Sequence, residues 1–199
     1  MNGLNKSETI IKLIDENNAD ELSALAKNIY SHYYDYLWNE GGKDWYMHVY
    51  AYNVDVIKKE LSDKNNLHYI AYQNHEGVAY IKIKIDAVLK GFEQFNALEL
   101  ERIYILPKAA GKGLGKQLIQ LTFDIADQHH KQMIFLKAMD TGTNAIAFYN
   151  SFGFEECGRF ILSAPPFNLM KEEFRGMIIL KKMLSIDLNV EECDATKVK

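Results

Sequence analysis

One segment limits the choice of fold for this chain more strongly than any other. It spans residues 98–117 and reads LELERIYILPKAAGKGLGKQ. Its apolar residues predict a strand that stops at Pro107, followed by a turn with three glycines and then a helix. Glycines let the backbone approach a ligand closely, and the start of a helix adds a partial positive charge. A tight turn between two elements also needs glycines, so this pattern alone favours an anion site and a simple turn about equally.

Two common phosphate-binding motifs do not fit this glycine turn. A Walker A loop needs a glycine six positions before its Lys-Ser/Thr pair, but that position is Ala110 and Lys116 is followed by Gln117. A dinucleotide fingerprint reads G-x-G-x-x-G, whereas this turn reads G-x-G-x-G, lies past the middle of the chain and lacks a convincing ribose-binding acid. Both motifs are therefore excluded by the residues present.

A second motif lies downstream, at residues 144–154, and reads NAIAFYNSFGF. Together the two motifs resemble the GNAT superfamily of N-acetyltransferases. Its acyl-CoA-binding signature is [Arg/Gln]-x-x-Gly-x-[Gly/Ala], and its later helix reads Asn-x-[Ile/Ala]-x-[Phe/Leu]-Tyr-x-x-x-Gly-Phe. Gly113 and Gly115 match the last two positions of the first signature, whereas Ala110 stands where Arg or Gln is usual. The resemblance covers the second half of the chain well and the first half in outline.

The resemblance implies a fold of the α/β (α+β) class. In the GNAT fold a mixed, mostly antiparallel central sheet with splayed middle strands is flanked by helices. We expect a single N-acetyltransferase domain over residues 1–184 and a polar C-terminal tail over residues 185–199. No internal repeat or linker interrupts the chain.

The resemblance also implies an activity, namely transfer of the acetyl group of acetyl-CoA to a primary amine of a small molecule. The amine would attack directly in a ternary complex, with no metal. The strings ELERIY and NAIAFY are similar to the PaiA-like, polyamine-acetylating branch of the family. Two alternatives stay open: acetylation of a protein N-terminus or lysine, and a catalytically silent acyl-CoA-binding module.

The residues expected to bind the acetyl-CoA cosubstrate follow from the matched motifs. The strand edge would pair with the pantetheine arm, and backbone N–H groups of the turn would hold the pyrophosphate. Asn144 would contact the pantetheine side or cap the helix that follows it, or do both. The predicted cofactor-binding residues are Ile103, Tyr104, Ile105, Gly111, Lys112, Gly113, Leu114, Gly115, Lys116 and Asn144.

The same resemblance assigns the catalytic roles. Tyr149 matches the general acid that protonates the leaving thiolate, although an aromatic ring packed on the helix face is the structural alternative. Glu99 matches the general base of some members, and Glu101 or bulk water could replace it. Alternation along the strand places Glu99 and Glu101 on one face with Ile103 and Ile105, and the even-numbered residues on the other.

Two departures from the family pattern bear on CoA affinity. Ala110 removes a side chain that usually supports the pyrophosphate, and Ser151 stands where a basic residue often contacts the 3′-phosphate. We expect weaker CoA binding, compensated by backbone contacts and by Lys112 and Lys116.

Composition limits the partners of this chain. Hydrophobic residues make up 48% and charged residues 25% of 199 residues, and the net charge is −4, which argues against a general nucleic-acid binder. No apolar run is long enough to span a bilayer, and two cysteines are too few for a disulfide framework. We expect a cytoplasmic protein that acts on a small-molecule amine, without nucleic acid or membrane partners and with a homodimer left open.

Hydrophobic periodicity predicts the remaining elements. Residues 33–52 hold eight aromatic side chains, which form core and interface or, alternatively, wall the acceptor site. Loops at 86–97 and 163–175 would also border the acceptor. Strands are expected at residues 9–14, 68–73, 78–85, 98–106, 133–138, 154–162 and 177–184, with a turn at 74–77. Helices are expected from Asn18 to near Gly41-Gly42, at 53–63, from the glycine turn to about 129, and at 143–152.

Overall fold

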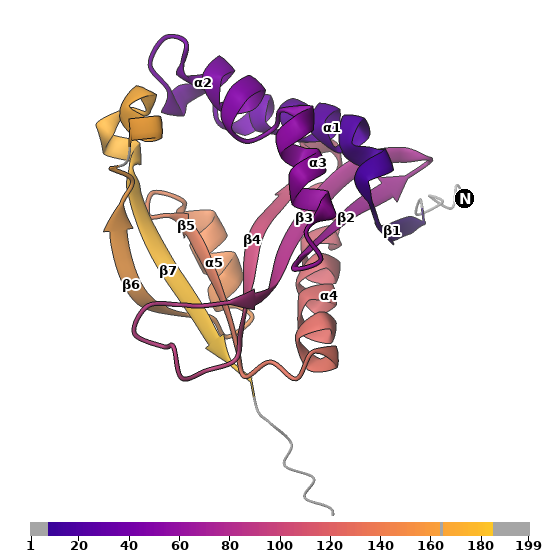
Figure 1. The fold of residues 1–199 in the computed structure, drawn as a ribbon, viewed down its shortest axis with the longest axis vertical. Coiled ribbons are helices and arrows are strands. Elements are labelled where there is room, and N and C mark those ends of the chain that lie inside the picture. The colour runs from indigo at the N-terminus through magenta and orange to yellow at the C-terminus, as the bar shows by residue number, and fades with distance from the viewer. Residues whose placement is uncertain (1–7, 164, 185–199) are drawn as a thin grey trace, which may run out of the picture.

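The computed structural model describes residues 8–163 and 165–184. Seven strands form one sheet in the order β1-β2-β3-β4-β5-β7-β6 (Figure 1). Every neighbouring pair is antiparallel except β4 and β5, which run parallel. The predicted fold class is therefore confirmed, and the predicted tail at 185–199 lies outside the described residues. The strands are β1 (Thr9–Leu13), β2 (Asn66–Gln73), β3 (Glu76–Ala87), β4 (Ala97–Ile105), β5 (Met133–Met139), β6 (Glu155–Ile161) and β7 (Gly176–Met183).

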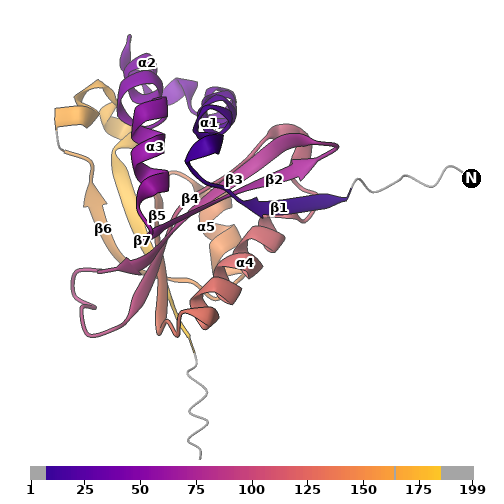
Figure 2. The same ribbon diagram turned by 45° about the vertical axis from the view of Figure 1, so that its right-hand side comes forward.

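Helices cover both faces of the sheet (Figure 2). One face carries α1 (Ala19–Tyr33) and α3 (Val54–Ser62), and the other carries α4 (Leu114–Gln128) and α5 (Thr143–Asn150). A short α2 (Gly42–Trp45) continues into a π-helical turn, η3 (Tyr46–Tyr50). Among the described residues, no helix combines the length and apolarity needed to cross a membrane. The 3₁₀ turns are η1 (Glu16–Asn18), η2 (Asp35–Leu37), η4 (Pro107–Ala109), η5 (Pro165–Leu169) and η6 (Glu172–Phe174).

Alternation along β3 feeds two separate cores. Ile81 and Ile83 pack under α4, whereas Tyr80 packs with α1 and α3. From the alternation of Ile81 and Ile83 with Lys82 and Lys84, the sequence predicts that Lys82 lies on a solvated face. This prediction is wrong, since Lys82 is only 3% exposed. The reason is that α3 covers this face and places Glu60 2.9 Å from the Lys82 ammonium.

The hairpin between β2 and β3 is tighter than predicted. Gln73 pairs with Glu76, which leaves a turn of only Asn74 and His75, at φ of 51° and 65°. Asn tolerates this left-handed conformation at low cost, so the strands continue to the turn. The other predicted elements are present, with ends displaced by one or two residues in most cases. The exception is the first helix, which was predicted to end near Gly41-Gly42. It ends at Tyr33, where the chain turns into η2.

A β-bulge in β4 changes the face that its residues occupy. Lys82 of β3 pairs with Arg102 but the next residue, Ile83, pairs with Leu100, so Glu101 is the extra residue. Because a bulge shifts the alternation by one, Ile103 packs into the same core as Leu100. The predicted sharing of one face by Glu101 and Ile103 is therefore wrong.

The two central strands separate partway along their length. Backbone pairing of β4 with β5 runs from Ala97–Met133 to Leu100–Leu136 and then ends. Beyond that point β4 stays paired with β3, and β5 stays paired with β7 as far as Met139. The second half of β4 thus presents an unpaired edge toward β5, as the splayed sheet of the predicted fold requires.

Candidate functional site

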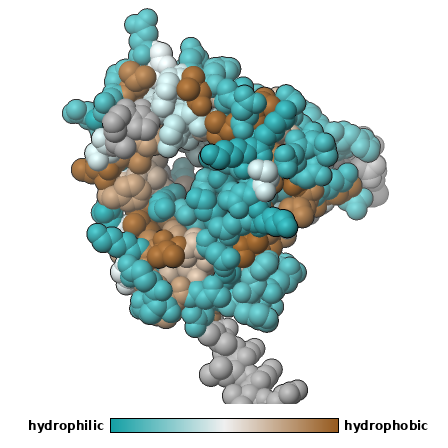
Figure 3. Space-filling model, in the orientation of Figure 1, coloured by the Kyte–Doolittle hydropathy of each residue, from teal (hydrophilic) through white to brown (hydrophobic). Residues whose placement is uncertain are grey.

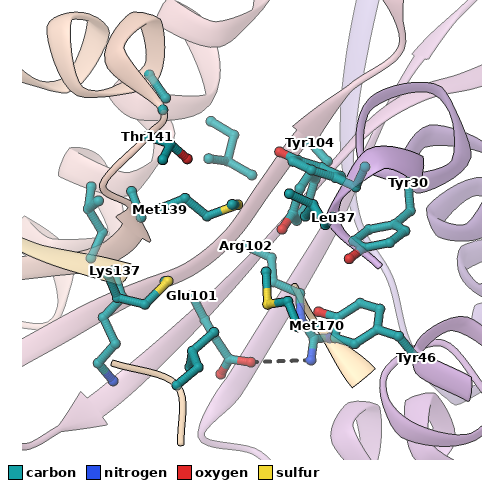
Figure 4. Close-up of a pocket in the computed structure, with 18 of the residues that line it drawn as sticks. Tyr30, Leu37, Tyr46, Glu101, Arg102, Tyr104, Lys137, Met139, Thr141 and Met170 are labelled. Atoms are coloured by element: carbon teal, nitrogen blue, oxygen red, sulfur yellow. Dashed lines mark ion pairs between the residues drawn. The ribbon is translucent and has the colours of Figure 1, made fainter. Parts of the chain in front are cut away.

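A cavity of about 270 Å³ occupies the space between the diverging ends of β4 and β5. The space-filling view of this side of the molecule shows a hollow with apolar surface on one side and hydrophilic surface on the other (Figure 3). In the close-up, Tyr30 and Tyr46 reach inward opposite Met139, with Glu101 and Arg102 between the two sides (Figure 4). The cavity also receives residues from α1, η2, η3, α5 and the β6–β7 connection, so segments far apart in sequence contribute to it.

Backbone N–H groups gather where the free edge of β4 leads into α4. Gly111 and Gly113 have φ of 71° and 86°, which a side chain would strain, and α4 begins at Leu114. Within the described part of the chain, no backbone carbonyl or side chain accepts a hydrogen bond from the N–H groups of residues 111–116. Six adjacent N–H groups at a helix start are the arrangement that anionic ligands bind.

Side chains around this turn add positive charge and a close packing contact. A Cβ on Gly115 would lie 3.1 Å from the ring of Phe148 on α5, so glycine lets α4 and α5 approach there. Lys112 donates to the carbonyl of Lys108, and Lys116 is exposed at the first turn of α4. Ala110 has extended backbone at the end of η4.

Tyr149 lines the cavity from α5 and is 8% exposed. Its ring contacts those of Phe148 and Phe154, which hold it in place. Burial, with a smaller contribution from Tyr34, raises the pKa of the Tyr149 hydroxyl well above its usual range. The phenol is therefore protonated at neutral pH, as an ordinary tyrosine also is, and the raised pKa makes it a weaker proton donor than an exposed tyrosine.

The two candidate carboxylates lie in different surroundings. Glu99 is absent from the cavity lining, is 7% exposed, and places Oε1 2.9 Å from the Lys137 ammonium. Glu101 does line the cavity, where its Oε1 lies 2.9 Å from the ammonium of Lys82. Burial alone would raise the pKa of Glu101, but Arg102 and Lys82 outweigh burial and lower it to about 2. A carboxyl with this pKa is a weak proton acceptor.

Glu101 belongs to a buried charge cluster that the sequence analysis missed. Arg102 makes a bidentate pair with Glu60 of α3, at 2.8 and 3.1 Å, and its guanidinium lies over the Tyr52 ring. His68 is almost fully buried beside Glu60, and burial lowers its pKa to about 4, so it is neutral at pH 7. Three cations thus face two carboxylates: Lys82, Lys84 and Arg102 against Glu60 and Glu101. The sequence shows Lys82, Lys84 and Glu101 as charged residues within predicted strands. It does not show that Glu60 of α3 pairs with this group.

Aromatic rings make up the wall opposite β5. Four of the eight aromatic residues in segment 33–52 line the cavity, and the remaining four pack elsewhere. Three further rings come from α1, β4 and the β6–β7 connection. The expectation that some of these rings wall a site therefore agrees with their positions in the cavity. The seven aromatic residues of this wall are Tyr30, Tyr34, Tyr36, Trp38, Tyr46, Tyr104 and Phe167.

Segment 35–42 and the connection between β6 and β7 are far apart in sequence but meet beside this wall. Figure 1 shows α2 next to that connection. The N–H of Asn39 donates to the Leu169 carbonyl and that of Lys171 to the Leu37 carbonyl, each at 2.9 Å. A bridge between Trp38 and Met170 lies between these two bonds. The two segments together close one side of the cavity.

The downstream motif is placed on α5, with one correction. The helix begins at Thr143 behind a Gly142 N-cap, so Asn144 is its second residue and the predicted N-cap role for Asn144 is wrong. The Asn144 side chain is exposed. The Ser151 hydroxyl donates to the Phe148 carbonyl at 2.6 Å, near the end of the helix.

Comparison with known proteins gives a family match and similarity to curated relatives. A model of the acetyltransferase (GNAT) family matches residues 27–154. A protein of Lactobacillus delbrueckii subsp. lactis, named an uncharacterized N-acetyltransferase in the pepI 3′ region, is 29% identical over 101 residues. This match covers 51% of the present chain, which spans only 58% of the relative's length.

Solved structures are similar over most of the chain. PaiA N-acetyltransferase from Thermoplasma acidophilum, in complex with coenzyme A, has a TM-score of 0.67 at 18% identity, covering 89% of this chain and 99% of its own. Ribosomal-protein-alanine N-acetyltransferase from Brucella melitensis has a TM-score of 0.65 at 20% identity, covering 88% and 99%. At these identities the similarity extends to the fold.

Proposed function

This chain belongs to the acetyltransferase (GNAT) family, and from that premise we propose that it transfers the acetyl group of acetyl-CoA to a primary amine of a small molecule. One observation carries the proposal. The unpaired edge of β4 leads at one end into free N–H groups and borders, along its length, a cavity that contains Tyr149. An extended thioester cosubstrate with a pyrophosphate fits these two features together. The PaiA structure, a fold relative, is one in complex with coenzyme A.

The cosubstrate would lie along the split between the central strands. The N–H groups of Gly111, Lys112, Gly113, Leu114, Gly115 and Lys116 would bind the pyrophosphate, with Lys112 and Lys116 adding charge. The amide groups of the pantetheine arm would bond to the β4 edge at Ile103, Tyr104 and Ile105, as an added strand would. Asn144, exposed at the start of α5, would face the same arm.

The reaction would then proceed by direct attack. The neutral amine nitrogen forms a bond to the thioester carbonyl carbon, and the carbon–sulfur bond breaks as the tetrahedral adduct collapses. The departing thiolate takes the proton of the Tyr149 hydroxyl, and the amine nitrogen loses one of its protons to a base. Its place in the cavity supports Tyr149 in this role.

The identity of the base is less well supported by geometry. Glu99 stays the predicted base, but its ion pair with Lys137 and its position outside the cavity lining favour water in its place. Glu101 lines the cavity, yet its low pKa makes it a poor acceptor of the amine's proton. An amine that arrives already neutral needs only water.

Acetylation of a protein N-terminus is the second candidate, because one fold relative is named a ribosomal-protein-alanine N-acetyltransferase. The bridge from segment 35–42 to the β6–β7 connection favours a small acceptor, since it closes a side by which a chain could leave the cavity.

The test is a screen for acetyl-CoA-dependent CoA release with small primary amines and with peptides that begin with alanine. Mass spectrometry of the products identifies the acetylated nitrogen. We expect small amines to be turned over with higher kcat/KM than the peptides. Rapid peptide acetylation without small-amine turnover would replace the proposal with the second candidate.

A further inference from the structure

The walls of the cavity suggest which kind of amine it accepts. Resting on the proposed function, we propose that the acceptor is an arylalkylamine, in which a flat apolar group fills the tyrosine-lined side, and that polycationic amines are poor acceptors. Two observations support this proposal. Aromatic rings and methionine thioethers form the cavity wall, and every carboxylate in the described lining is already paired with a cation.

The wall is suited to a flat apolar group. Besides Tyr149, seven aromatic residues line the cavity, and three methionines, Met139, Met170 and Met177, face it as well. The rings hold one another in fixed positions: Tyr30 stacks on Tyr46 with centroids 4.8 Å apart, and Tyr34 meets Tyr104 edge-on at 5.8 Å. Thioethers and ring edges both pack well against an aromatic group. An aryl group would thus meet preformed contacts.

The charges near the cavity oppose a polycation. A second or third ammonium of a polyamine needs a carboxylate, and Glu101 is the single one in the described lining. Glu101 already has Lys82 at 2.9 Å and Lys84 at 3.0 Å, and the cluster as a whole holds three cations against two carboxylates. A polyamine would therefore place positive charge beside a net positive cluster. Glu99, the other candidate carboxylate of β4, is likewise paired, with its Oε1 2.9 Å from the Lys137 ammonium.

One aromatic residue offers a clean test, because it can change without harm to the core. Tyr36 lines the cavity and is 52% exposed, with its ring edge-on to Phe174 at 5.0 Å. Tyr33 lies three residues earlier and is 38% exposed, but it is absent from the lining. The two positions form a matched pair in which only one contacts the acceptor.

The experiment measures kcat and KM for 2-phenylethylamine, spermidine and an alanine-starting peptide at saturating acetyl-CoA. We expect the highest kcat/KM with 2-phenylethylamine. Tyr36→Ala should raise its KM roughly 3- to 10-fold, the scale for loss of one ring contact, with little change in kcat. Tyr33→Ala should leave both constants unchanged. Tyr36→Glu should lower the KM for spermidine and raise that for 2-phenylethylamine.

The outcomes separate this inference from the proposed function. If spermidine matches or exceeds 2-phenylethylamine, the inference is wrong while small-amine acetylation stands. Equal effects of Tyr36→Ala and Tyr33→Ala would also overturn it. If acetyl-CoA binds, as a melting shift would report, but no amine or peptide is acetylated, the proposed function is wrong and the inference falls with it.

Discussion

The two sides of the cavity are built in opposite ways. The side proposed to bind acetyl-CoA comes from two continuous stretches, β4 through the start of α4, and α5. The side proposed to bind the amine is assembled from α1, η2, η3 and the β6–β7 connection, which are far apart in sequence. The first can be recognised from local patterns, whereas the second depends on how distant segments pack.

The two sides also differ in chemistry. On the acetyl-CoA side, backbone N–H groups would bind the ligand, and this requires glycine, which has no side chain, at Gly111, Gly113 and Gly115. The amine side works through side chains that fill space, mainly tyrosines. Added bulk should therefore damage the first side, and removed bulk the second, while Tyr149 serves both.

The largest effect is expected at Tyr149, where the two sides meet. Tyr149→Phe keeps the buried ring and deletes the proton donor, so kcat should fall by roughly 10²- to 10⁴-fold. The melting temperature and the affinity for acetyl-CoA should hardly change, because the hydroxyl acts in the transition state. Tyr33→Phe removes a hydroxyl outside the cavity lining and serves as control. Full kcat in Tyr149→Phe, with acetyl-CoA still bound, would refute the acid role.

The backbone site is tested by a pair of glycine variants. Gly113 and Gly91 both have φ of +86° and open space where a Cβ would lie, but only Gly113 lies in the proposed pyrophosphate site. Gly113→Val and Gly91→Val should each cost about 1–3 kcal/mol in strain. Acetyl-CoA at 100 times its Kd should stabilise wild type and Gly91→Val by about 2.7 kcal/mol.

Gly113→Val should lose most of that stabilisation, because a branched side chain blocks the approach of the pyrophosphate. Thermal melts with and without acetyl-CoA measure the difference. An equal ligand shift in both variants would show that the pyrophosphate binds elsewhere.

The charge cluster on the amine side predicts a dependence of stability on pH. Burial lowers the pKa of His68 to about 4, against 6.5 when unfolded, and neither ring nitrogen has a hydrogen-bond partner among the described residues. The unfolded chain therefore binds more protons between these values, so the free energy of unfolding falls by about 3 kcal/mol as pH drops from 6.5 to 4.

His68→Leu should reduce the fall in the free energy of unfolding between pH 6.5 and 4. It should cause no loss of stability at pH 7, because it removes an unpaired buried polar ring. His129→Leu, at an exposed position, should leave the slope as it is. Chemical denaturation at pH 7, 5.5 and 4.5 provides the measurement. An unchanged slope in His68→Leu would show that His68 is not the source of this acid sensitivity. Glu101 acts at lower pH, because its pKa of about 2 places its loss of stabilisation below pH 4.5.

The smallest effect concerns the contact between segment 35–42 and the β6–β7 connection. A Cβ on Gly42 would lie 2.8 Å from the Leu169 carbonyl oxygen, so Gly42→Ala should push the two segments apart at a cost of about 1–3 kcal/mol. The KM for the amine should rise, and the acetyl-CoA melting shift should persist. Gly41→Ala has no atom near its Cβ but has a φ of 75°, so it strains the backbone without touching Leu169 and serves as the control for backbone strain. A lost acetyl-CoA shift in Gly42→Ala would mean that the two sides are not separable.

Sequence patterns anticipated the sheet, most of the helices and the glycine turn, and the family resemblance singled out Tyr149, which lines the cavity. They placed Glu101 and Ile103 on one face of β4, because simple alternation cannot register a bulge whose extra residue is revealed only by pairing with β3. They also treated Lys82 as solvated, because the α3 carboxylate that covers it lies 22 positions away. Each error arose where a partner distant in sequence decided the outcome.

Residues 98–117 and 144–154 carried the family, the fold class and the expected acetyl-CoA site, because strand, turn and helix there are consecutive and their geometry follows from local backbone preferences. Tertiary structure decided the rest. It set Glu99 against Lys137 and outside the cavity, locked Glu101 among Lys82, Lys84 and Arg102, and brought Tyr36 and Phe167 to one wall. The environment of a carboxylate or a ring depends on what packs against it, and those neighbours become known only when distant segments are brought together.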